Sequence, residues 1–267
     1  MLAEQKGRRQ REVKIFLSSL EQGAHTVETK QPLAHYVVEK GVKMKWNLMS
    51  FYYIRKNTDL ANFIKKHSEE VMIDSGAHSF QKGKRVDWLE YTKQYAEFIK
   101  MFDDDKVVGY FEMDVDNVLG YDKVLELRSI LESVSDKIIP VWHENRGIEE
   151  FKKMCRDYAG KIVAISGIRG EIKDEQFIMF VKYAKKFNCK VHCLGMTRKA
   201  ILDKVPFDYV DSSSWKQSGL YGRIDGKGKV TRDFSKTKRE VVFLENYKAG
   251  IEKQEHYHKK WQKVCHD

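Results

Sequence analysis

The sequence predicts one closed (β/α)8 barrel, an α/β fold of eight parallel strands surrounded by helices. Eight short apolar runs have the β-branched and aromatic composition of buried strands, and amphipathic helix patterns separate most of them. Strands that alternate with crossover helices pair in parallel, and eight such units close into a barrel. The length of 267 residues fills one such barrel. An open doubly wound sheet is the alternative, but it needs a glycine-rich phosphate loop after the first strand, and residues 18–23 do not form one.

The expected strands follow one another at regular spacing along the chain. Each is a short apolar or aromatic run, and Pro206 marks the start of the last one. The eight strands are expected over residues 14–20, 46–54, 71–74, 107–113, 138–142, 162–166, 190–194 and 207–211.

Helices are expected wherever apolar residues recur with a period near 3.6. These segments are residues 33–39, 60–67, 88–102, 121–133, 148–158, 173–187 and 198–204. A basic lead (residues 6–11) precedes the first strand. Residues 216–267 are expected to form a basic loop and a C-terminal helical extension, with the loop over 219–229 and the helix over about 238–264. We therefore expect a single domain over residues 1–267.

The composition indicates a protein of the cytoplasm. No run of about 18 apolar residues is present, so no membrane span is expected. The N-terminus lacks the apolar segment of a secretory signal. The four cysteines are scattered and suggest no disulfide framework. The sequence is compatible with a homodimer but does not specify one.

Three of the expected strands end in acidic residues. Asp74 ends the third strand and precedes Ser75, Asp114 follows the fourth strand, and Asp211 ends the eighth. A carboxyl group at the end of a buried strand is costly unless it is hydrogen-bonded or functional. Because the carboxyl ends of all barrel strands meet at one face, these residues predict an active site there.

The charge indicates a polyanionic partner. The formal net charge is +10, and basic residues cluster beyond the last expected strand, on the barrel face of Asp211. Basic side chains interleaved with aromatic ones can follow a phosphate backbone and stack a base. The expected contacts are Trp215, Lys216, Tyr221, Arg223, Lys227, Lys229 and Arg232. Helical lysines such as Lys182, Lys185 and Lys186 are more simply interpreted as a solvated face.

Four motifs, in matching order, resemble the tRNA-guanine transglycosylase superfamily. Residues 74–80 (DSGAHSF) resemble its Asp-Ser-Gly-Gly-Phe-Gln signature, and residues 207–211 (FDYVD) resemble its Val-Asp-x-Phe-Asp motif. Residues 166–171 (SGIRGE) are similar to its Gly-Gly-Leu-x-x-Gly-Glu loop, and residues 192–196 (HCLGM) to its Leu-x-Gly strand end. The resemblance covers most of the chain.

This resemblance implies a pentosyltransferase that exchanges guanine in a nucleic acid for a free 7-deazaguanine base, with no cofactor. Asp211 would be the nucleophile that attacks C1′ of the sugar, and Asp74 would transfer the proton of the leaving and incoming bases. An isolated Asp-Ser-Gly could instead be a turn that caps a helix.

The resemblance also implies a base pocket. Asp114, with Asp116 as the alternative register, would read the guanine edge, and Ser75 and His143 would lie beside it. Gly167 and Gly195 would let the backbone approach the flat base, although simple turn geometry is an equal explanation.

The departures from the tRNA enzymes favour DNA as the polymer. The Cys-x-Cys-x-x-Cys zinc motif is missing, and we expect no metal; the C-terminal His256, His258, Cys265 and His266 are better explained as a solvated helix end. The segment after Asp211 is Ser-Ser-Ser-Trp in place of Pro-Thr-Arg. These features are similar to the phage and bacterial branch that inserts bases such as 7-cyano-7-deazaguanine into DNA and protects phage DNA from restriction. A tRNA enzyme, a nucleosidase-like barrel and a non-catalytic nucleic-acid-binding barrel remain alternatives.

Overall fold

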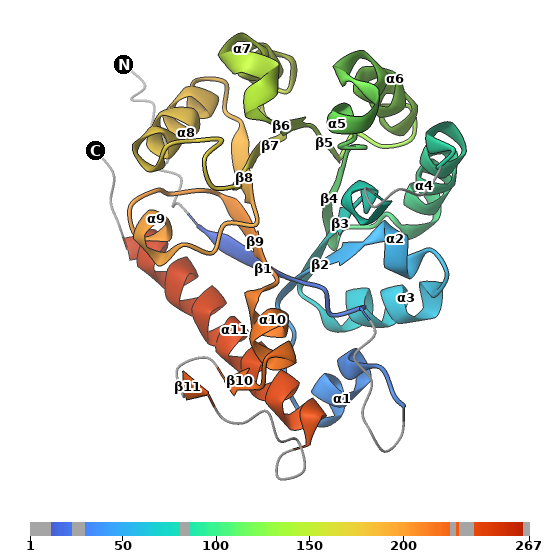
Figure 1. The fold of residues 1–267 in the computed structure, drawn as a ribbon, viewed down its shortest axis with the longest axis vertical. Coiled ribbons are helices and arrows are strands. Elements are labelled where there is room, and N and C mark those ends of the chain that lie inside the picture. Colours follow the sequence, from blue (N-terminus) through green and yellow to red (C-terminus); the bar gives the residue numbers. More distant parts are fainter. Residues whose placement is uncertain (1–11, 23–29, 81–85, 225–227, 230–237, 264–267) are drawn as a thin grey trace, which may run out of the picture.

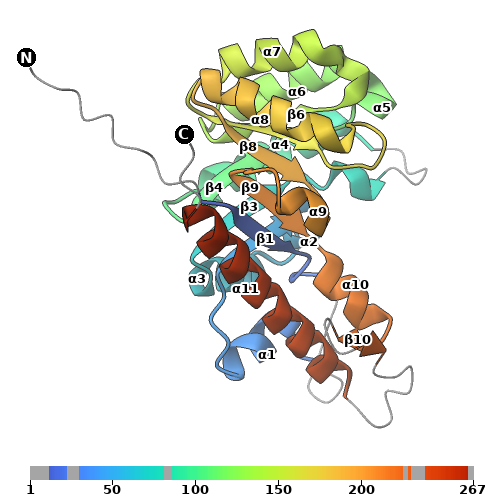
Figure 2. The same ribbon diagram turned by 90° about the vertical axis from the view of Figure 1, so that its left-hand side faces the viewer.

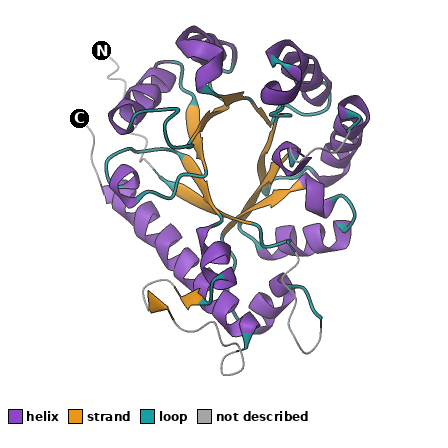
Figure 3. Cartoon of the chain, in the orientation of Figure 1, coloured by secondary structure: helices purple, strands orange, loops and turns teal. Residues whose placement is uncertain are grey.

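The structure is a computed structural model that describes residues 12–22, 30–80, 86–224, 228–229 and 238–263. Its centre is a ring of parallel strands enclosed by helices (Figures 1 and 3). The strands are β1 (Lys14–Ser18), β2 (Trp46–Ser50), β3 (Glu70–Asp74), β4 (Val107–Phe111), β5 (Ile138–Ile139), β6 (Val141–Trp142), β7 (Ile162–Ser166), β8 (Lys190–Leu194) and β9 (Tyr209–Ser212). The fold is the α/β barrel that the sequence predicts.

The ring closes through a single interrupted strand. The sheet runs in the order β5-β4-β3-β2-β1-β9-β8-β7-β6, with β5 paired to β4 and β6 paired to β7. β5 and β6 are two halves of residues 138–142, divided at Pro140, which has no N–H to donate to a neighbouring strand. The nine strands therefore occupy the eight positions of a (β/α)8 barrel.

Most helices lie where the sequence places them. The outer layer contains α1 (Leu33–Glu39), α3 (Thr58–His67), α4 (Trp88–Phe102), α6 (Tyr121–Glu132), α7 (Gly147–Asp157), α8 (Phe177–Lys186), α9 (Lys199–Leu202) and α11 (Arg239–Lys263). Shorter elements at the strand ends are α2 (Phe51–Ile54), the 3-10 turns η1 (Ala77–Phe80), η2 (Glu144–Arg146) and η3 (Asp174–Gln176), and α5 (Asp116–Leu119). None of the described helices is long and apolar enough to cross a membrane.

Two segments differ from the sequence prediction. Residues 51–54, expected to continue the second strand, form the helical turn α2, which buries Phe51 and Ile54 beneath the outer layer. The expected basic loop begins with helix α10 (Ser214–Leu220), followed by the short antiparallel strands β10 (Arg223–Ile224) and β11 (Gly228–Lys229).

Helix α11 belongs to the outer layer of the barrel, where it lies across β1 (Figure 2). Gln254 is buried and donates through Nε2 to the carbonyl oxygens of Ile15 (2.7 Å) and Trp46 (2.8 Å). The Tyr247 hydroxyl donates to Asn47 Oδ1 at 2.8 Å. Gly250 faces Leu17, where a Cβ would approach the leucine methyl groups to 2.9 Å. The C-terminal helix that the sequence analysis describes as an extension of the barrel therefore packs on β1 and covers its outer face.

Candidate active site

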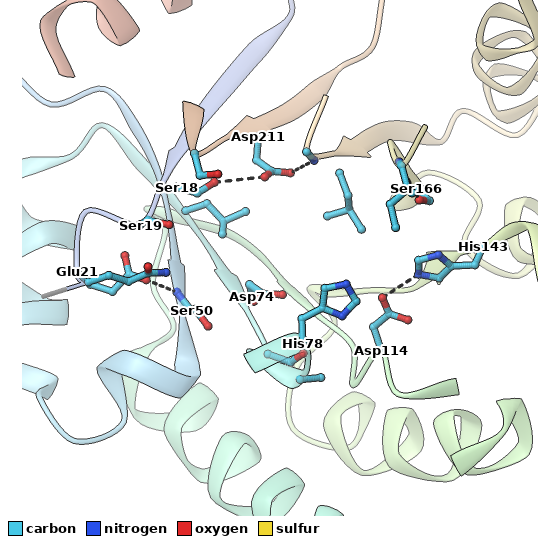
Figure 4. Close-up of a pocket in the computed structure, with 18 residues that line it drawn as sticks. Ser18, Ser19, Glu21, Ser50, Asp74, His78, Asp114, His143, Ser166 and Asp211 are labelled. Atoms are coloured by element: carbon cyan, nitrogen blue, oxygen red, sulfur yellow. Dashed lines mark hydrogen bonds and ion pairs between the residues drawn. The ribbon is translucent and has the colours of Figure 1, made fainter. Parts of the chain in front are cut away.

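A cavity of about 460 Å³ opens at the carboxyl ends of the strands (Figure 4). This volume lies within the range of small-molecule sites. Six residues that the sequence analysis names as candidates line it: Asp74, Ser75, Asp114, His143, Gly195 and Asp211. The structure thus brings these side chains to one mouth of the barrel, as the strand-end argument predicts.

Asp211 is held by three hydrogen-bond donors from the two strands that flank β9, β8 and β1. Its Oδ1 accepts from the backbone N–H of Gly195 at 2.8 Å and lies 3.0 Å from His192 Nε2. Its Oδ2 accepts from Ser18 Oγ at 3.2 Å. Since Oδ1 has two partners and Oδ2 one, the carboxylate is oriented with Oδ2 as the freer oxygen.

The sequence argument did not identify His192. The ring is fully buried inside the barrel, edge-on to Phe111 at 4.9 Å, and its Nδ1 has no hydrogen-bond partner in the described structure. An unpaired ring N–H would be more costly than an unpaired lone pair, so we assign the neutral tautomer with its proton on Nε2, donating to Asp211. The alternation of β8, in which Val191 and Cys193 pack outside the barrel, was the available signal that His192 points inward.

Asp74, at the end of β3, is half-buried beside Asp211. Burial raises its pKa to about 6; the N–H of Gly76 opposes this shift, and the charges of Asp211 and Asp114 add to it. Gly76 donates to Asp74 Oδ2 at 3.0 Å. The glycine is required because its φ is +75° and a Cβ would approach Cβ of Tyr52 to 2.5 Å. Asp74 therefore can exchange a proton near neutral pH.

Helix α4 fixes the strand end that carries Asp74. Tyr91 donates its hydroxyl to the carbonyl oxygen of Ser75 at 2.7 Å, and Tyr95 donates to that of Ile73 at 3.1 Å. Ser75 itself is buried and lines the cavity. These bonds satisfy the backbone where β3 leaves the sheet, and they give the carboxyl group of Asp74 a fixed direction.

Asp114 and His143 form an ion pair on the other side of the cavity. His143 Nε2 lies 2.8 Å from Asp114 Oδ2, and its Nδ1 lies 3.1 Å from Glu171 Oε2. Burial opposes the charged imidazole, but the bonds to Asp114 and Glu171 prevail and raise the pKa of His143 to about 9. The imidazolium is therefore the expected form at neutral pH.

Of the two candidate residues for reading the guanine edge, Asp114 and Asp116, the cavity lining distinguishes one, although a buried arginine contacts both. Arg146 donates from Nη2 to Asp114 Oδ1 at 3.3 Å, from Nε to Asp116 Oδ2 at 3.0 Å, and from Nη1 to Glu112 Oε1 at 3.0 Å. Asp116 does not line the cavity, whereas Asp114 does. The register alternative Asp116 is thus a structural partner of Arg146.

Glu21 and Ser50 form a further polar part of the cavity that the sequence argument did not identify. The Ser50 backbone N–H donates to Glu21 Oε1 at 3.0 Å. Burial raises the pKa of Glu21 to about 7, against the opposing effects of this bond and of Lys216. The only sequence feature that could have identified Glu21 as a site residue is its position in the turn after β1.

Trp215 and Gly167 do not play the parts that the sequence suggested. Trp215 is buried, donates from Nε1 to the carbonyl oxygen of Ser18 at 2.9 Å, and packs on Tyr247. The expectation that Trp215 stacks a base is therefore wrong for this structure. Gly167 does not line the cavity; a Cβ there would lie 2.0 Å from the carbonyl oxygen of Leu194, so its role is close packing of two strand ends.

The other expected nucleic-acid contacts are divided. Tyr221 and Arg223 are exposed, whereas Lys216 is partly buried and donates to Gln22 Oε1 at 2.7 Å. Lys229 lies in β11, and Lys227 and Arg232 lie outside the described residues. Among described residues, no group of three or more His, Cys, Asp or Glu could hold a metal ion. His256 and His258 lie in α11, and Cys265 and His266 lie outside the description.

Comparisons with known proteins show no family. No protein-family model matches the chain, and no curated protein matches it. A solved structure from Aquifex aeolicus VF5 has 14% identity, a TM-score of 0.46, and coverage of 90% of this chain and 94% of that chain. A 2,3-dimethylmalate lyase of the PEP mutase/isocitrate lyase superfamily has 10% identity, a TM-score of 0.36, and coverage of 92% and 95%. A probable 2-pyrone-4,6-dicarboxylic acid hydrolase from Acinetobacter baumannii has 9% identity, a TM-score of 0.33, and coverage of 92% and 95%. Similarities this low carry no argument about function.

Proposed function

We propose that this protein exchanges guanine in DNA for a 7-deazaguanine base through a covalent aspartyl–sugar intermediate. The observation that carries the proposal is a pair of unlike carboxyl groups in one cavity. Asp211 is oriented by three donors, and Asp74 has its pKa raised to about 6. A nucleophile beside a carboxyl group that can hold a proton is the arrangement needed for double displacement at a sugar carbon.

In the first displacement, Asp211 Oδ2 attacks C1′ of the sugar. The new C1′–O bond forms as the C1′–N9 bond breaks, and N9 of the leaving guanine takes the proton of Asp74. Hydrogen bonds from Gly195 and His192 keep Oδ1 turned away from the sugar and leave Oδ2 to react.

In the second displacement, the incoming base reverses these steps. Asp74, now ionised, removes the proton from the ring nitrogen of the incoming base. That nitrogen attacks C1′, the ester bond breaks, and the electron pair returns to Asp211. Asp74 ends protonated, as it began, so no external acid or base is consumed.

The base is held by the opposite side of the cavity in this proposal. Asp114 accepts from N1–H and the exocyclic amine of guanine, and the His143 and Arg146 contacts keep its carboxylate in place. A guanine in duplex DNA must be flipped out to reach this site, at a cost of a few kcal/mol. Exposed Tyr221 and Arg223, beyond β9, supply aromatic and basic contacts to the displaced strand.

The test is to trap the intermediate. The protein is incubated with a guanine-containing DNA oligonucleotide or with tRNA, then denatured and examined for a covalent protein–nucleic acid adduct. Exchange of labelled guanine, and incorporation of 7-cyano-7-deazaguanine, are measured on both polymers in parallel. We expect an adduct and exchange with DNA, and loss of both in Asp211→Asn.

Other outcomes identify the alternatives. Exchange in tRNA and none in DNA assigns a tRNA enzyme. Release of guanine from free nucleosides, without exchange, assigns a nucleosidase. Salt-sensitive binding with neither adduct nor exchange assigns a non-catalytic nucleic-acid-binding barrel. Near-normal exchange by Asp211→Asn would show that the nucleophile is misassigned.

A further inference from the structure

We infer that Glu21 and Ser50 form a subsite that binds a polar nitrogen substituent at C7 of the incoming 7-deazaguanine base. The inference rests on the proposed function and names the group by which the enzyme distinguishes the incoming base from guanine. It depends on two unpaired polar atoms, on their place in the cavity, and on the shape of the base.

The two unpaired atoms are Glu21 Oε2 and Ser50 Oγ. Both are buried, and in the described structure neither has a hydrogen-bond partner. The exposed fraction of each residue is only 7%. Buried polar atoms in folded proteins nearly always have a partner, and an unpaired one costs free energy. Two such atoms, on residues joined by a 3.0 Å hydrogen bond, therefore indicate a place where a polar ligand group binds.

Glu21 and Ser50 line the same cavity as the paired aspartates. In Figure 4 they lie on one side of Asp74 and Asp211, and Asp114 and His143 lie on the other. The cavity thus has an acidic centre with a polar group of residues at each end. The centre and this end of the cavity interact electrostatically, because the charge of Asp74 contributes to the raised pKa of Glu21.

The shape of the base connects the two ends. When Asp114 holds N1–H and the exocyclic amine, the five-membered ring points the opposite way, toward Asp211 and C1′. The C7 substituent is carried by this ring and extends toward Glu21 and Ser50. Guanine has a bare ring nitrogen at this position and cannot reach them.

Base exchange needs such a subsite because leaving and incoming bases share the same guanine edge. Asp114 cannot distinguish them, so selectivity must come from the C7 position. A carboxyl oxygen accepts from N–H groups of an aminomethyl or carboxamide substituent, and the serine hydroxyl, or a protonated carboxyl group, donates to a nitrile. Both classes share one chemistry, a polar nitrogen group at C7.

The experiment compares exchange of labelled guanine with incorporation of 7-cyano-, 7-aminomethyl- and 7-carboxamido-7-deazaguanine. Unsubstituted 7-deazaguanine serves as the probe without a polar group. The variants are Glu21→Gln, which keeps an acceptor for the Ser50 N–H, and Ser50→Ala. The exposed Glu97→Gln on α4 is the matched control.

We expect the ratio of kcat/KM for the preferred substituted base to that for guanine to fall about 10-fold in each cavity variant, the effect of one lost hydrogen bond. Glu97→Gln leaves the ratio at the wild-type value. The substituent with the largest fall is assigned to the subsite.

Two results separate this inference from the proposed function. Exchange with unchanged ratios in Glu21→Gln and Ser50→Ala overturns the subsite but not base exchange. A wild-type protein that exchanges no base, including guanine, overturns the proposed function. Thermal unfolding of each variant shows that a changed ratio comes from a folded protein.

Discussion

At the scale of single residues, the cavity gives similar acids different environments. Asp211 has three donors, Asp74 has the N–H of Gly76 and the adjacent charge of Asp211, and Asp114 is paired with His143. Acids held in different environments can take different chemical parts. The sequence predicted these three aspartates because each follows a strand. Glu21 also follows an expected strand, the first, but it was not singled out, and nothing in the sequence signals the hydrogen bond of His192.

The raised pKa of Asp74 predicts two opposite pH dependences. Expulsion of guanine needs the protonated acid, so kcat/KM for the nucleic acid should fall as pH rises through about 6. Attack by the incoming base needs ionised Asp74, so kcat/KM for the base should rise with pH. The midpoint of this rise should lie below 6, since esterified Asp211 no longer contributes its charge.

Steady-state kinetics between pH 4.5 and 8 would measure both limbs. Asp74→Asn should lower both constants by about 10²–10⁴-fold and abolish both limbs. Limbs that persist in Asp74→Asn would assign the proton transfer to another group, with Glu21 the next candidate.

At the scale of elements, strands were predicted better than the segments after them. Apolar runs identified all eight barrel positions, and the bounds of β7, β8, α1 and α4 agree with the prediction. Residues 51–54 are as apolar as a strand, and only tertiary packing makes them the turn α2. Trp215 looked like an exposed aromatic among basic residues because the sequence does not show that α10 packs on α11.

The contact between the ends of β7 and β8 predicts the effect of Gly167→Ala. Its Cβ would lie 2.0 Å from the carbonyl oxygen of Leu194, a backbone atom that cannot turn aside. We expect the free energy of unfolding to fall by about 1–3 kcal/mol or more, since overpacking usually costs this amount. Displacement of Leu194 should also move Gly195 away from Asp211.

Urea denaturation and adduct formation would measure the two effects. Gly170→Ala is a useful comparison, because no atom lies within 4 Å of its added Cβ but its φ is +99°. Gly170→Ala reports backbone strain alone, so Gly167→Ala should lose more adduct. Equal adduct levels in the two variants would exclude a link between this contact and Asp211.

At the scale of the whole molecule, the titratable groups of the cavity make the folded state less stable as pH rises. Burial raises the pKa of Glu21 and partial burial raises that of Asp74, so the folded protein retains protons that the unfolded chain has lost. His143 acts in the same direction, because its pKa is raised to about 9 by Asp114 and Glu171. Each group contributes stability at low pH that is lost as pH rises toward its folded pKa.

The three groups together predict a melting temperature that falls as pH rises from about 5.5 to 8.5. The corresponding decrease in the free energy of unfolding should be on the order of a few kcal/mol. Solvent screening at half-buried Asp74 reduces its share of this decrease. Asp104 and Asp116, whose pKa values are lowered through Lys65 and Arg146 against the effect of burial, favour the folded state throughout this pH range and lose that contribution only at still lower pH. Thermal unfolding of the wild type and of Glu21→Gln tests the prediction. The variant should lose part of the slope, and a melting temperature that rises with pH would contradict it.

The position of β1 has a consequence for how the protein is made. β1 pairs with β2 on one side and with β9 on the other, and α11 covers its outer face. The side-chain bond from Ser18 to Asp211 spans 193 positions of the chain. At about 5–20 residues per second, a ribosome needs roughly 10–40 s to make the segment between them. During that time the nascent chain has an apolar strand with one unpaired edge, the kind of surface that aggregates. Pairing between residues this far apart in the sequence slows folding, so one edge of β1 stays unpaired until β9 has emerged.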